Sequence, residues 1–537
     1  MKDNLVKQNI VTRICSMIAV GLVGLIFIIL SSASILQTCR IDPAYPANEI
    51  INFDSDFFLV NLALIILTLL AGIGLIRKRV SMAKVDTGFM IFIMLIVTTV
   101  LSLTWVNLTR SVATGDESLL LNTAKDAAKG MYTNFQQSYE FYGYRSYFLY
   151  YPEKLGFVFF AEILYRIFGA ECSELLIQIP NVIALDLIYV GVVMIAKRLF
   201  KDSSVPNLTA LALIACFQPM FMTTFTQSVL LSLALSVWGV YFIIRYMQQD
   251  KLLHAGLSIL LTALGCVLRA SGLIFAAAII VALVIHTVDR RRLIALAAAA
   301  LLLLCAVGLP KLVTLQYSSR SGAELNTHIT AKMKVYSGIS ESNMAPGWYN
   351  GLDLITLRDA NMDMDAGNSK AQAGIDARLE VLQNENRLFE FLQKKLYSQF
   401  NEPSFQSVWI SQVKAHNLPE GETLSKFVDS VYTGGLSKLL GIWFNYYVMI
   451  LYIGFAAGMI FLMIRRRTNS ETIILPLTVL GGVIFHILFE AKSQYILPYL
   501  IIIIPFAMYG LCQLSRTLSR FTGWMYTDKA PDKTPEE

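Results

Sequence analysis

Hydrophobic residues along the chain form blocks of about 20 positions separated by short polar stretches, which is the length that an α-helix needs to cross a bilayer. The blocks that we interpret as spans cover residues 14–36, 57–76, 88–106, 176–195, 207–223, 228–244, 254–268, 273–286, 293–313, 443–464, 472–489 and 495–514. This pattern predicts an all-α polytopic membrane protein with about twelve transmembrane helices.

Composition and charge placement agree with this class. The 537 residues are 55% hydrophobic and 15% charged. The net charge of +6 does not indicate a nucleic-acid partner, because the basic residues lie at the ends of the apolar blocks, as the positive-inside rule requires of cytoplasmic loops. These clusters contain Lys2, Lys7 and Arg13; Arg77, Lys78 and Arg79; Lys197, Arg198 and Lys201; Arg245 and Lys251; Arg290, Arg291 and Arg292; Arg465, Arg466 and Arg467; and Arg516 and Arg520. We therefore expect paired spans and both termini in the cytoplasm.

One apolar stretch, residues 155–168, is too short to cross a bilayer. Lys154, Glu162 and Arg166 share one helical face, and Glu162 and Arg166 have the spacing of an i,i+4 ion pair. We predict an amphipathic helix in the outer membrane interface. A short helix buried among others is the alternative.

The hydrophobic pattern is interrupted by a long polar segment. We expect four parts: residues 1–315 with the first nine spans and a catalytic outer loop at 107–175, an extracytoplasmic domain or elaborated loop at 316–438, the last three spans at 439–516, and a cytoplasmic tail at 517–537. In the outer segment, Trp348 and Tyr349 occupy a turn-rich loop, where they either stack on a sugar or pack against their own scaffold. The acidic pair Asp363 and Asp365 is interpreted as a solvated loop.

Charged residues also stand at the predicted outer ends of the spans. Asp116 and Glu117 follow the third span, and a carboxylate placed there can act as a general base. Arg269 lies between two apolar blocks, and Glu490 and Lys492 lie in a similar break nearer the C-terminus. Because ionisable groups near hydrocarbon are costly, such residues tend to have partners or functions. They either contact a lipid phosphate or snorkel to the interface as caps.

The seven cysteines show no paired metal-binding spacing, and the five histidines are scattered. No protein metal site is therefore predicted, and no cofactor is certain, although a divalent cation near Asp116 is left open. Cys39 and Cys172 are both expected on the outer side, and whether they pair is also left open.

Three stretches carry a family resemblance: Asp116-Glu117, residues 150–169 and residues 490–499. They resemble bacterial membrane glycosyltransferases of the GT-C superfamily, in the group of protein O-mannosyltransferases and the lipid A aminoarabinose transferase. The resemblance implies a cell-envelope enzyme in the bacterial cytoplasmic membrane that moves a sugar, with inversion, from a polyprenyl-phosphate donor to an extracytoplasmic glycan, lipid or protein. Membrane lipids are the other expected partners.

The same resemblance suggests roles for individual residues. Asp116 takes the catalytic acidic role, and Glu117 supports it. The family pattern has an Arg where this chain has Gln494, which makes Lys492 or Arg269 the better phosphate clamp. The full set of expected substrate-binding residues is Arg269, Lys492, Glu490, Gln494, Tyr495, Tyr150, Tyr151 and Lys154.

Many secondary transporters also have about twelve transmembrane helices and both termini in the cytoplasm. A transporter or a glycolipid flippase is therefore the alternative function. The acidic outer loop and the large outer segment favour the enzyme.

Overall fold

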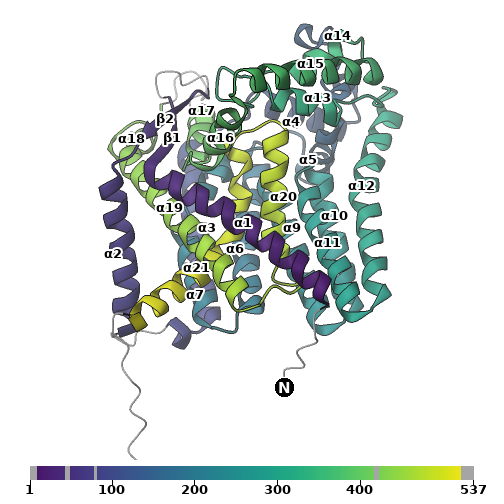
Figure 1. Cartoon of the computed structure of the whole chain (residues 1–537). Coiled ribbons are helices and arrows are strands. Elements are labelled where there is room, and N and C mark those ends of the chain that lie inside the picture. The colour runs from purple at the N-terminus through teal and green to yellow at the C-terminus, as the bar shows by residue number, and fades with distance from the viewer. Residues whose placement is uncertain (1–8, 43–48, 78–81, 416–422, 522–537) are drawn as a thin grey trace, which may run out of the picture.

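The computed structural model describes residues 9–42, 49–77, 82–415 and 423–521. Nine helices in these ranges are long and apolar enough to cross a membrane. They are α1 (Ile10–Leu36), α2 (Phe58–Arg77), α3 (Thr87–Thr109), α6 (Leu175–Leu199), α9 (Val229–Gln249), α11 (Gly272–Arg290), α12 (Leu293–Ser321), α19 (Gly435–Ile464) and α21 (Leu497–Phe521). Figure 1 shows most of them side by side as one bundle. The polytopic α-helical class predicted from the sequence is confirmed.

The other three predicted spans are also helical: one is broken by a bend, and two are short helices close to their predicted bounds. The block at 207–223 consists of α7 (Ser204–Ile214), α8 (Gln218–Phe221) and η6 (Met222–Thr224), with a bend of 49°. The blocks at 254–268 and 472–489 are the short helices α10 (Leu252–Leu268) and α20 (Ile474–Leu488). Extended backbone at Arg269 and near Lys492 follows the helices α10 and α20. Both breaks lie where the candidate site forms.

Close helix contacts in the bundle depend on small residues. Where α19 crosses α21, a Cβ atom added to Gly510 would lie 1.9 Å from the carbonyl oxygen of Gly454. A Cβ atom added to Gly458 would lie 2.4 Å from the carbonyl oxygen of Phe506. Glycine therefore lets these two backbones approach one another, as small residues do in other membrane bundles.

The short helix predicted at residues 155–168 has the predicted bounds. Helix α5 spans Leu155–Phe168, and Arg166 pairs with Glu162 at 2.8 Å. Glu162 is buried, and it is also bound by Tyr317 and Arg320 from the end of α12. One face of α5 thus packs on α4 (Asp116–Ala128), α10 and α12, while Ile167 and other apolar residues of the opposite face are exposed. This two-sided burial fits an interfacial helix better than a fully buried one.

The outer segment is mostly helical. It contains α13 (Ala331–Gly338), α14 (Leu352–Asp359), α15 (Met364–Asn384), α16 (Leu388–Phe400), α17 (Ser407–Ala415) and α18 (Lys426–Tyr432). Helices α13 to α15 lie above α4 and α5 in Figure 1, beyond the outer ends of the long helices. Asp363 caps the start of α15 and so has a structural function, whereas Asp365 is an exposed residue of the first turn of this helix.

A small hairpin and several 3₁₀ turns complete the structure. Strands β1 (Gln37–Ile41) and β2 (Ile51–Ser55) pair antiparallel. The 3₁₀ helices are η1 (Met82–Lys84), η2 (Thr133–Phe135), η3 (Glu140–Tyr142), η4 (Tyr147–Leu149), η5 (Pro152–Lys154) and η7 (Ser493–Tyr495). Cys39, in β1, and Cys172 are both free thiols, so the pairing left open by the sequence is not observed.

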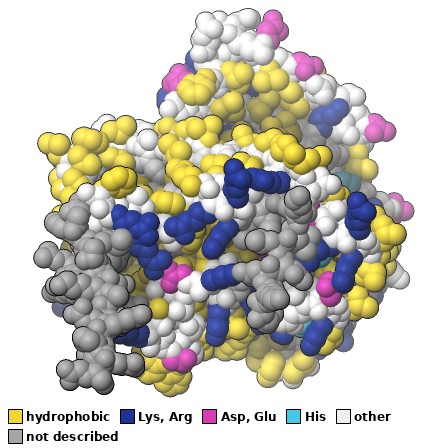
Figure 2. Space-filling view, turned by 60° about the horizontal axis from the view of Figure 1, so that its bottom comes forward, with side chains coloured by type: hydrophobic (Ala, Val, Ile, Leu, Met, Phe, Trp, Pro, Cys, Tyr) yellow, Lys and Arg dark blue, Asp and Glu magenta, His cyan; other side chains and the backbone are white. Residues whose placement is uncertain are grey.

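The end of the bundle opposite Asp116 is basic. Figure 2 shows Lys and Arg side chains gathered over this face, with a smaller number of acidic ones between them. We call it the inner face, because the positive-inside rule predicts that it faces the cytoplasm, and we call the Asp116 end the outer face. The predicted basic residues Lys2, Lys7, Lys78 and Arg79, and most of the 517–537 tail, lie outside the described residues.

Candidate functional site

A polar cavity of about 520 Å³ lies where the outer ends of the helices meet the outer segment. We call it the outer cavity. Eight of the ten residues expected at the site line it: Asp116, Tyr151, Lys154, Arg269, Glu490, Lys492, Gln494 and Tyr495. The chain thus brings together side chains that are up to 379 positions apart in sequence, from Asp116 to Tyr495. Glu117 and Tyr150 do not line this cavity.

Asp116 is the first residue of α4. The chain enters this helix through Gly115, whose φ of +55° favours glycine. The carboxylate is exposed to the cavity and accepts a hydrogen bond of 3.1 Å from the Tyr147 hydroxyl. The positive end of the helix dipole further favours negative charge there. Asp116 is therefore an anchored carboxylate that can accept a proton.

Glu117 points away from the cavity. Its buried carboxylate accepts hydrogen bonds from the backbone N–H of Thr226 at 3.1 Å and from the Thr226 hydroxyl at 2.5 Å. It also forms a buried ion pair with Lys414 of α17. Burial lowers the pKa of Lys414, while Glu117 acts in the opposite direction. The supporting role expected for Glu117 therefore does not involve direct contact with the cavity, because its Oε2 atom attaches α4, which begins at Asp116, to its neighbours.

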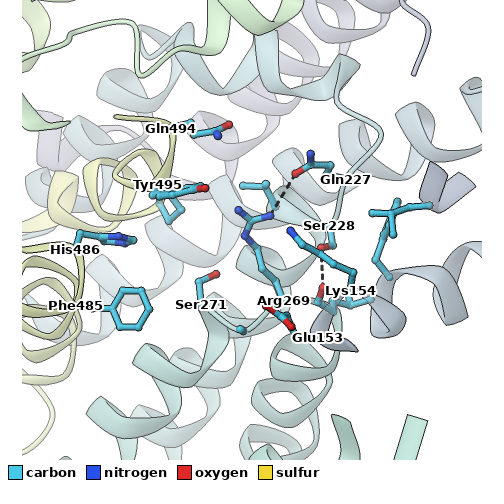
Figure 3. A pocket seen from close by; sticks show the side chains of 16 residues that line it. Glu153, Lys154, Gln227, Ser228, Arg269, Ser271, Phe485, His486, Gln494 and Tyr495 are labelled. Atoms are coloured by element: carbon cyan, nitrogen blue, oxygen red, sulfur yellow. Dashed lines mark hydrogen bonds between the residues drawn. The ribbon is translucent and has the colours of Figure 1, made fainter. Parts of the chain in front are cut away.

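Two cations face the cavity without carboxylate partners. Figure 3 shows Arg269 and Lys154 next to one another, with the Arg269 guanidinium directed to Gln227, to which it donates at 3.4 Å. Among the described residues, neither Arg269 nor Lys154 has a carboxylate oxygen within 4.0 Å. Burial and the charge of Arg269 lower the pKa of Lys154. An anion between these two side chains would relieve their repulsion, so they form a candidate phosphate site.

The other two cations of the cavity have carboxylate partners. Lys492 pairs with Glu49 at 2.6 Å, and Lys334 pairs with Glu153 at 3.0 Å. Lys492 was one of two candidates for the phosphate clamp, and its partner makes Arg269 the better one. Gln494 lies at the edge of the same group in Figure 3.

Glu490 and Asp353 are two further acids that line the outer cavity. Glu490 accepts a hydrogen bond of 3.1 Å from the Tyr495 hydroxyl. Asp353, at the start of α14, is 4% exposed, and burial together with the charge of Glu490 raises its pKa to about 6. Asp353 is thus a cavity acid whose charge changes near pH 6.

Aromatic rings cover the side of the cavity next to Asp116. Tyr147 contacts Tyr142 edge-to-face and Tyr151 at a tilt, with ring centroids 5.7 Å and 5.0 Å away, and Tyr349 also lines the cavity. Tyr150 is fully buried and donates a hydrogen bond of 3.0 Å to the Tyr142 carbonyl. The substrate-binding role expected for Tyr150 therefore does not fit, since adjacent tyrosines of this stretch point in different directions.

The aromatic loop at 346–351 contributes one residue to scaffold and one to the cavity. Trp348 is fully buried and donates to the Ser398 hydroxyl at 2.9 Å, whereas Tyr349 lines the cavity. The same loop pairs with the 490–492 stretch through a hydrogen bond of 2.9 Å from Ala491 N–H to the Gly347 carbonyl. Trp348 therefore packs against its scaffold, the alternative to sugar stacking considered from the sequence.

Lys395 fixes the segment after α20, which contains Glu490, through hydrogen bonds. Its buried ammonium donates to the carbonyls of Ile487 at 2.8 Å and Phe489 at 2.7 Å, and to the carbonyl of Gly338. Burial lowers the pKa of Lys395 to about 7. Because the last carbonyls of α20 have no partner within the helix, this cation replaces the missing donors and fixes where the chain turns into the cavity.

A second cavity of about 170 Å³ adjoins the outer cavity at the helix ends. The two cavities share eight lining residues, among them Lys154, Arg269 and Tyr495. The residues that line only the second cavity are mostly apolar and include Leu120, Phe157, Val229, Leu268 and Pro498. The two unpaired cations therefore lie at the boundary between a polar and an apolar space.

The described residues contain no group of three His, Cys, Asp or Glu side chains placed to hold a metal ion. The divalent cation left open near Asp116 thus has no such set of protein ligands in the described part of the chain.

Several cavity residues were not identified from the sequence. Asp353, Lys334 and Glu49 contribute charges to the cavity or to its ion pairs, and each lies in an unremarkable polar stretch. Lys414 and Lys395 were missed for a different reason, since both occur at helical positions that resemble a solvated face. No pattern within the sequence could have assigned their partners.

The fold and this cavity define a polytopic helical membrane protein with a charged site on its outer face. A family model described as dolichyl-phosphate-mannose-protein mannosyltransferase matches residues 153–312. The resemblance to GT-C membrane glycosyltransferases expected from the sequence is thereby confirmed for this segment, which includes Lys154 and Arg269. A comparison with curated proteins found no match.

Solved structures of two proteins show similarity to this chain. The oligosaccharyltransferase of Archaeoglobus fulgidus in its apo form is 12% identical, with a TM-score of 0.43, over 83% of this chain and 53% of that one. ArnT from Cupriavidus metallidurans bound to undecaprenyl phosphate is 10% identical, with a TM-score of 0.34, over 83% of this chain and 82% of that one. The present chain spans about half the length of the oligosaccharyltransferase.

Proposed function

We propose that this protein is a glycosyltransferase that moves a sugar from a polyprenyl-phosphate donor to an acceptor outside the cytoplasm. The observation that supports this most directly is the outer cavity, in which the Asp116 carboxylate and the unpaired cations Arg269 and Lys154 line one space. The acceptor is a cell-wall polysaccharide, a teichoic acid, a glycolipid or a protein.

In this proposal the donor phosphate binds Arg269 and Lys154. A guanidinium can hold phosphate through two hydrogen bonds, and Lys154 adds a second positive charge. The apolar cavity beside them accommodates the first part of the polyprenyl chain, as its lining by Phe157 and Val229 favours. The sugar then extends into the polar cavity toward the tyrosine wall.

Asp116 then acts as the general base. It accepts the proton of the acceptor hydroxyl while the acceptor oxygen forms a bond to the anomeric carbon, and the bond from that carbon to the phosphate oxygen breaks. The displaced polyprenyl phosphate keeps the electron pair, and its added charge is stabilised by Arg269 and Lys154. Attack opposite the leaving phosphate inverts the configuration at the anomeric carbon.

Reconstituted protein provides the test. Proteoliposomes containing the full chain receive a polyprenyl-phosphate donor with a labelled sugar, together with an envelope fraction as acceptor. The proposal expects label in the acceptor and release of polyprenyl phosphate in equal amount. Movement of the intact donor across the bilayer without release of polyprenyl phosphate would instead identify the flippase or transporter alternative.

A further inference from the structure

A separate cavity of about 310 Å³ lies at the inner face, at the other end of the bundle from Asp116. We call it the inner-face cavity. Its lining includes Lys201 and Asp202 from the connection between α6 and α7, Arg465 and Arg467 after α19, and Tyr509 and Arg516 of α21. These parts of the chain take no part in the proposed transfer chemistry.

The inner-face cavity has an excess of positive charge. Among the described lining residues, the arginines Arg465, Arg467 and Arg516 stand against one carboxylate, Asp202, so the arginines alone leave two positive charges in excess. Asp202 is already bound by Arg516 at 2.6 Å. Arg465 donates at 2.5 Å to the side-chain oxygen of Gln513, which is neutral and does not offset its charge. The cavity therefore favours an anionic ligand.

Tyr509 provides a second, independent observation. It is 2% exposed and lines the cavity, yet its hydroxyl has no hydrogen-bond partner within the described part of the chain. Its ring is stacked on Phe200, with a centroid distance of 4.8 Å and an interplanar angle of 20°. A buried hydroxyl without a partner is unfavourable, so a ligand oxygen that accepts its hydrogen bond would complete the site.

The position of the cavity identifies the kind of anion. Arg465 directly follows the last residue of α19, and Arg516 lies in the final turns of α21, so both are at the level where helices leave the bilayer. Basic pockets between helix ends on the cytoplasmic side suit anionic lipid headgroups, and Figure 2 shows that this face is basic. We infer that the inner-face cavity binds a phosphate group, supplied by an anionic phospholipid of the adjacent leaflet.

Native mass spectrometry of the full chain in detergent tests this inference. The protein is titrated with phosphatidylglycerol, and with phosphatidylcholine as the zwitterionic reference. Arg467→Gln should weaken phosphatidylglycerol binding by roughly 10- to 150-fold, the effect of losing one direct charge-assisted contact to a phosphate. Tyr509→Phe, which removes a single oxygen, should also weaken it while leaving the fold intact.

The chain offers a matched control one residue away. Arg466→Gln removes the same charge from the same face, but Arg466 does not line the cavity. This variant should bind phosphatidylglycerol as the wild type does. Equal losses in the Arg466 and Arg467 variants would overturn the site, because they would reflect the general charge of the surface.

A second arm identifies the source of the phosphate. Inorganic phosphate is titrated against the lipid-free protein, with thermal shift as the readout. Inorganic phosphate could bind the wild type but not Arg467→Gln, while the Arg467 and Tyr509 variants leave phosphatidylglycerol binding unchanged. In that case the ligand is a free phosphate and the lipid assignment is wrong. Selective loss of phosphatidylglycerol binding supports the lipid.

Discussion

At the scale of single residues, ion pairing separates the charges of the outer cavity into two groups. Lys492 and Lys334 are neutralised by Glu49 and Glu153, whereas Arg269 and Lys154 have no carboxylate partner among the described residues. The sequence identified both Arg269 and Lys492 as candidates, because both stand in breaks between apolar blocks. It could not show which of them is already paired.

The first prediction concerns the phosphate clamp. Arg269→Gln should raise the apparent KM for the polyprenyl-phosphate donor by roughly 10- to 150-fold, the effect of losing a charge-assisted contact of about 1.5 to 3 kcal/mol. Arg269→Lys should recover part of this loss, since a point charge replaces a two-pronged donor. The measurement is initial transfer rate against donor concentration. Lys332→Gln, an exposed cation of α13 outside the cavity, is the control.

The second prediction concerns Asp353. Its pKa is raised from 3.8 to about 6 when the chain folds, so the folded state holds its proton more tightly than the unfolded state. The stabilisation that comes from binding this proton is fully present below about pH 3.8. It is lost as the pH rises through 6, because the folded state then releases the proton. Asp353→Asn should therefore stabilise the protein by about 3 kcal/mol at pH 7.5, and by less at pH 5.

Thermal unfolding of the purified protein at the two pH values measures this effect. The difference in Tm between Asp353→Asn and the wild type should be positive, and larger at pH 7.5 than at pH 5. A variant that is less stable than the wild type at pH 7.5 would show that the ionised carboxylate has a favourable partner in the folded state.

At the scale of elements, the site depends on contacts that hold its supporting helices. Helix α4, which presents Asp116, is attached to α17 through the Glu117–Lys414 pair, and the end of α20 is attached to α16 through Lys395. Both attachments use residues of the outer segment, so this segment positions the cavity from outside the membrane. Periodicity predicted helices in this segment, but tertiary contacts decide which charges they bury.

The third prediction tests the Glu117–Lys414 attachment. Glu117→Gln leaves Lys414 charged and buried, and should destabilise the protein by about 3 to 5 kcal/mol. The double variant Glu117→Gln with Lys414→Met removes the unpaired charge and should recover most of the loss. Thermal unfolding and transfer rate are measured together. If Glu117→Gln lost transfer at full stability, Glu117 would be a catalytic group after all.

At the scale of the whole molecule, the sequence predicted the spans better than the site. All twelve apolar blocks are helical because bilayer length and hydrophobicity determine them locally. Two of them are short helices, and extended backbone that carries Arg269 and Lys492 follows their outer ends. The cavity itself depends on contacts between residues hundreds of positions apart, which periodicity does not encode.

The fourth prediction is topological. Single cysteines at Asp365 and at Arg466, both exposed, are introduced into a background without other reactive thiols. The basic inner face predicts that a membrane-impermeant reagent applied to intact cells labels the Asp365 position and does not label the Arg466 position. Permeabilised cells, in which both positions should react, are the control. Labelling at Arg466 in intact cells would reverse the orientation.

The central claim is that Asp116 is the base in a transfer reaction within the outer cavity. Its most direct test is the single-turnover rate of Asp116→Asn, measured with the donor already bound. We predict that donor binding is retained and that transfer falls by roughly 10²- to 10⁴-fold, as expected for a lost general base. Asp365→Asn, the same change in the first turn of α15 outside the cavity, should keep the wild-type rate. Near-normal transfer by folded Asp116→Asn would contradict the account.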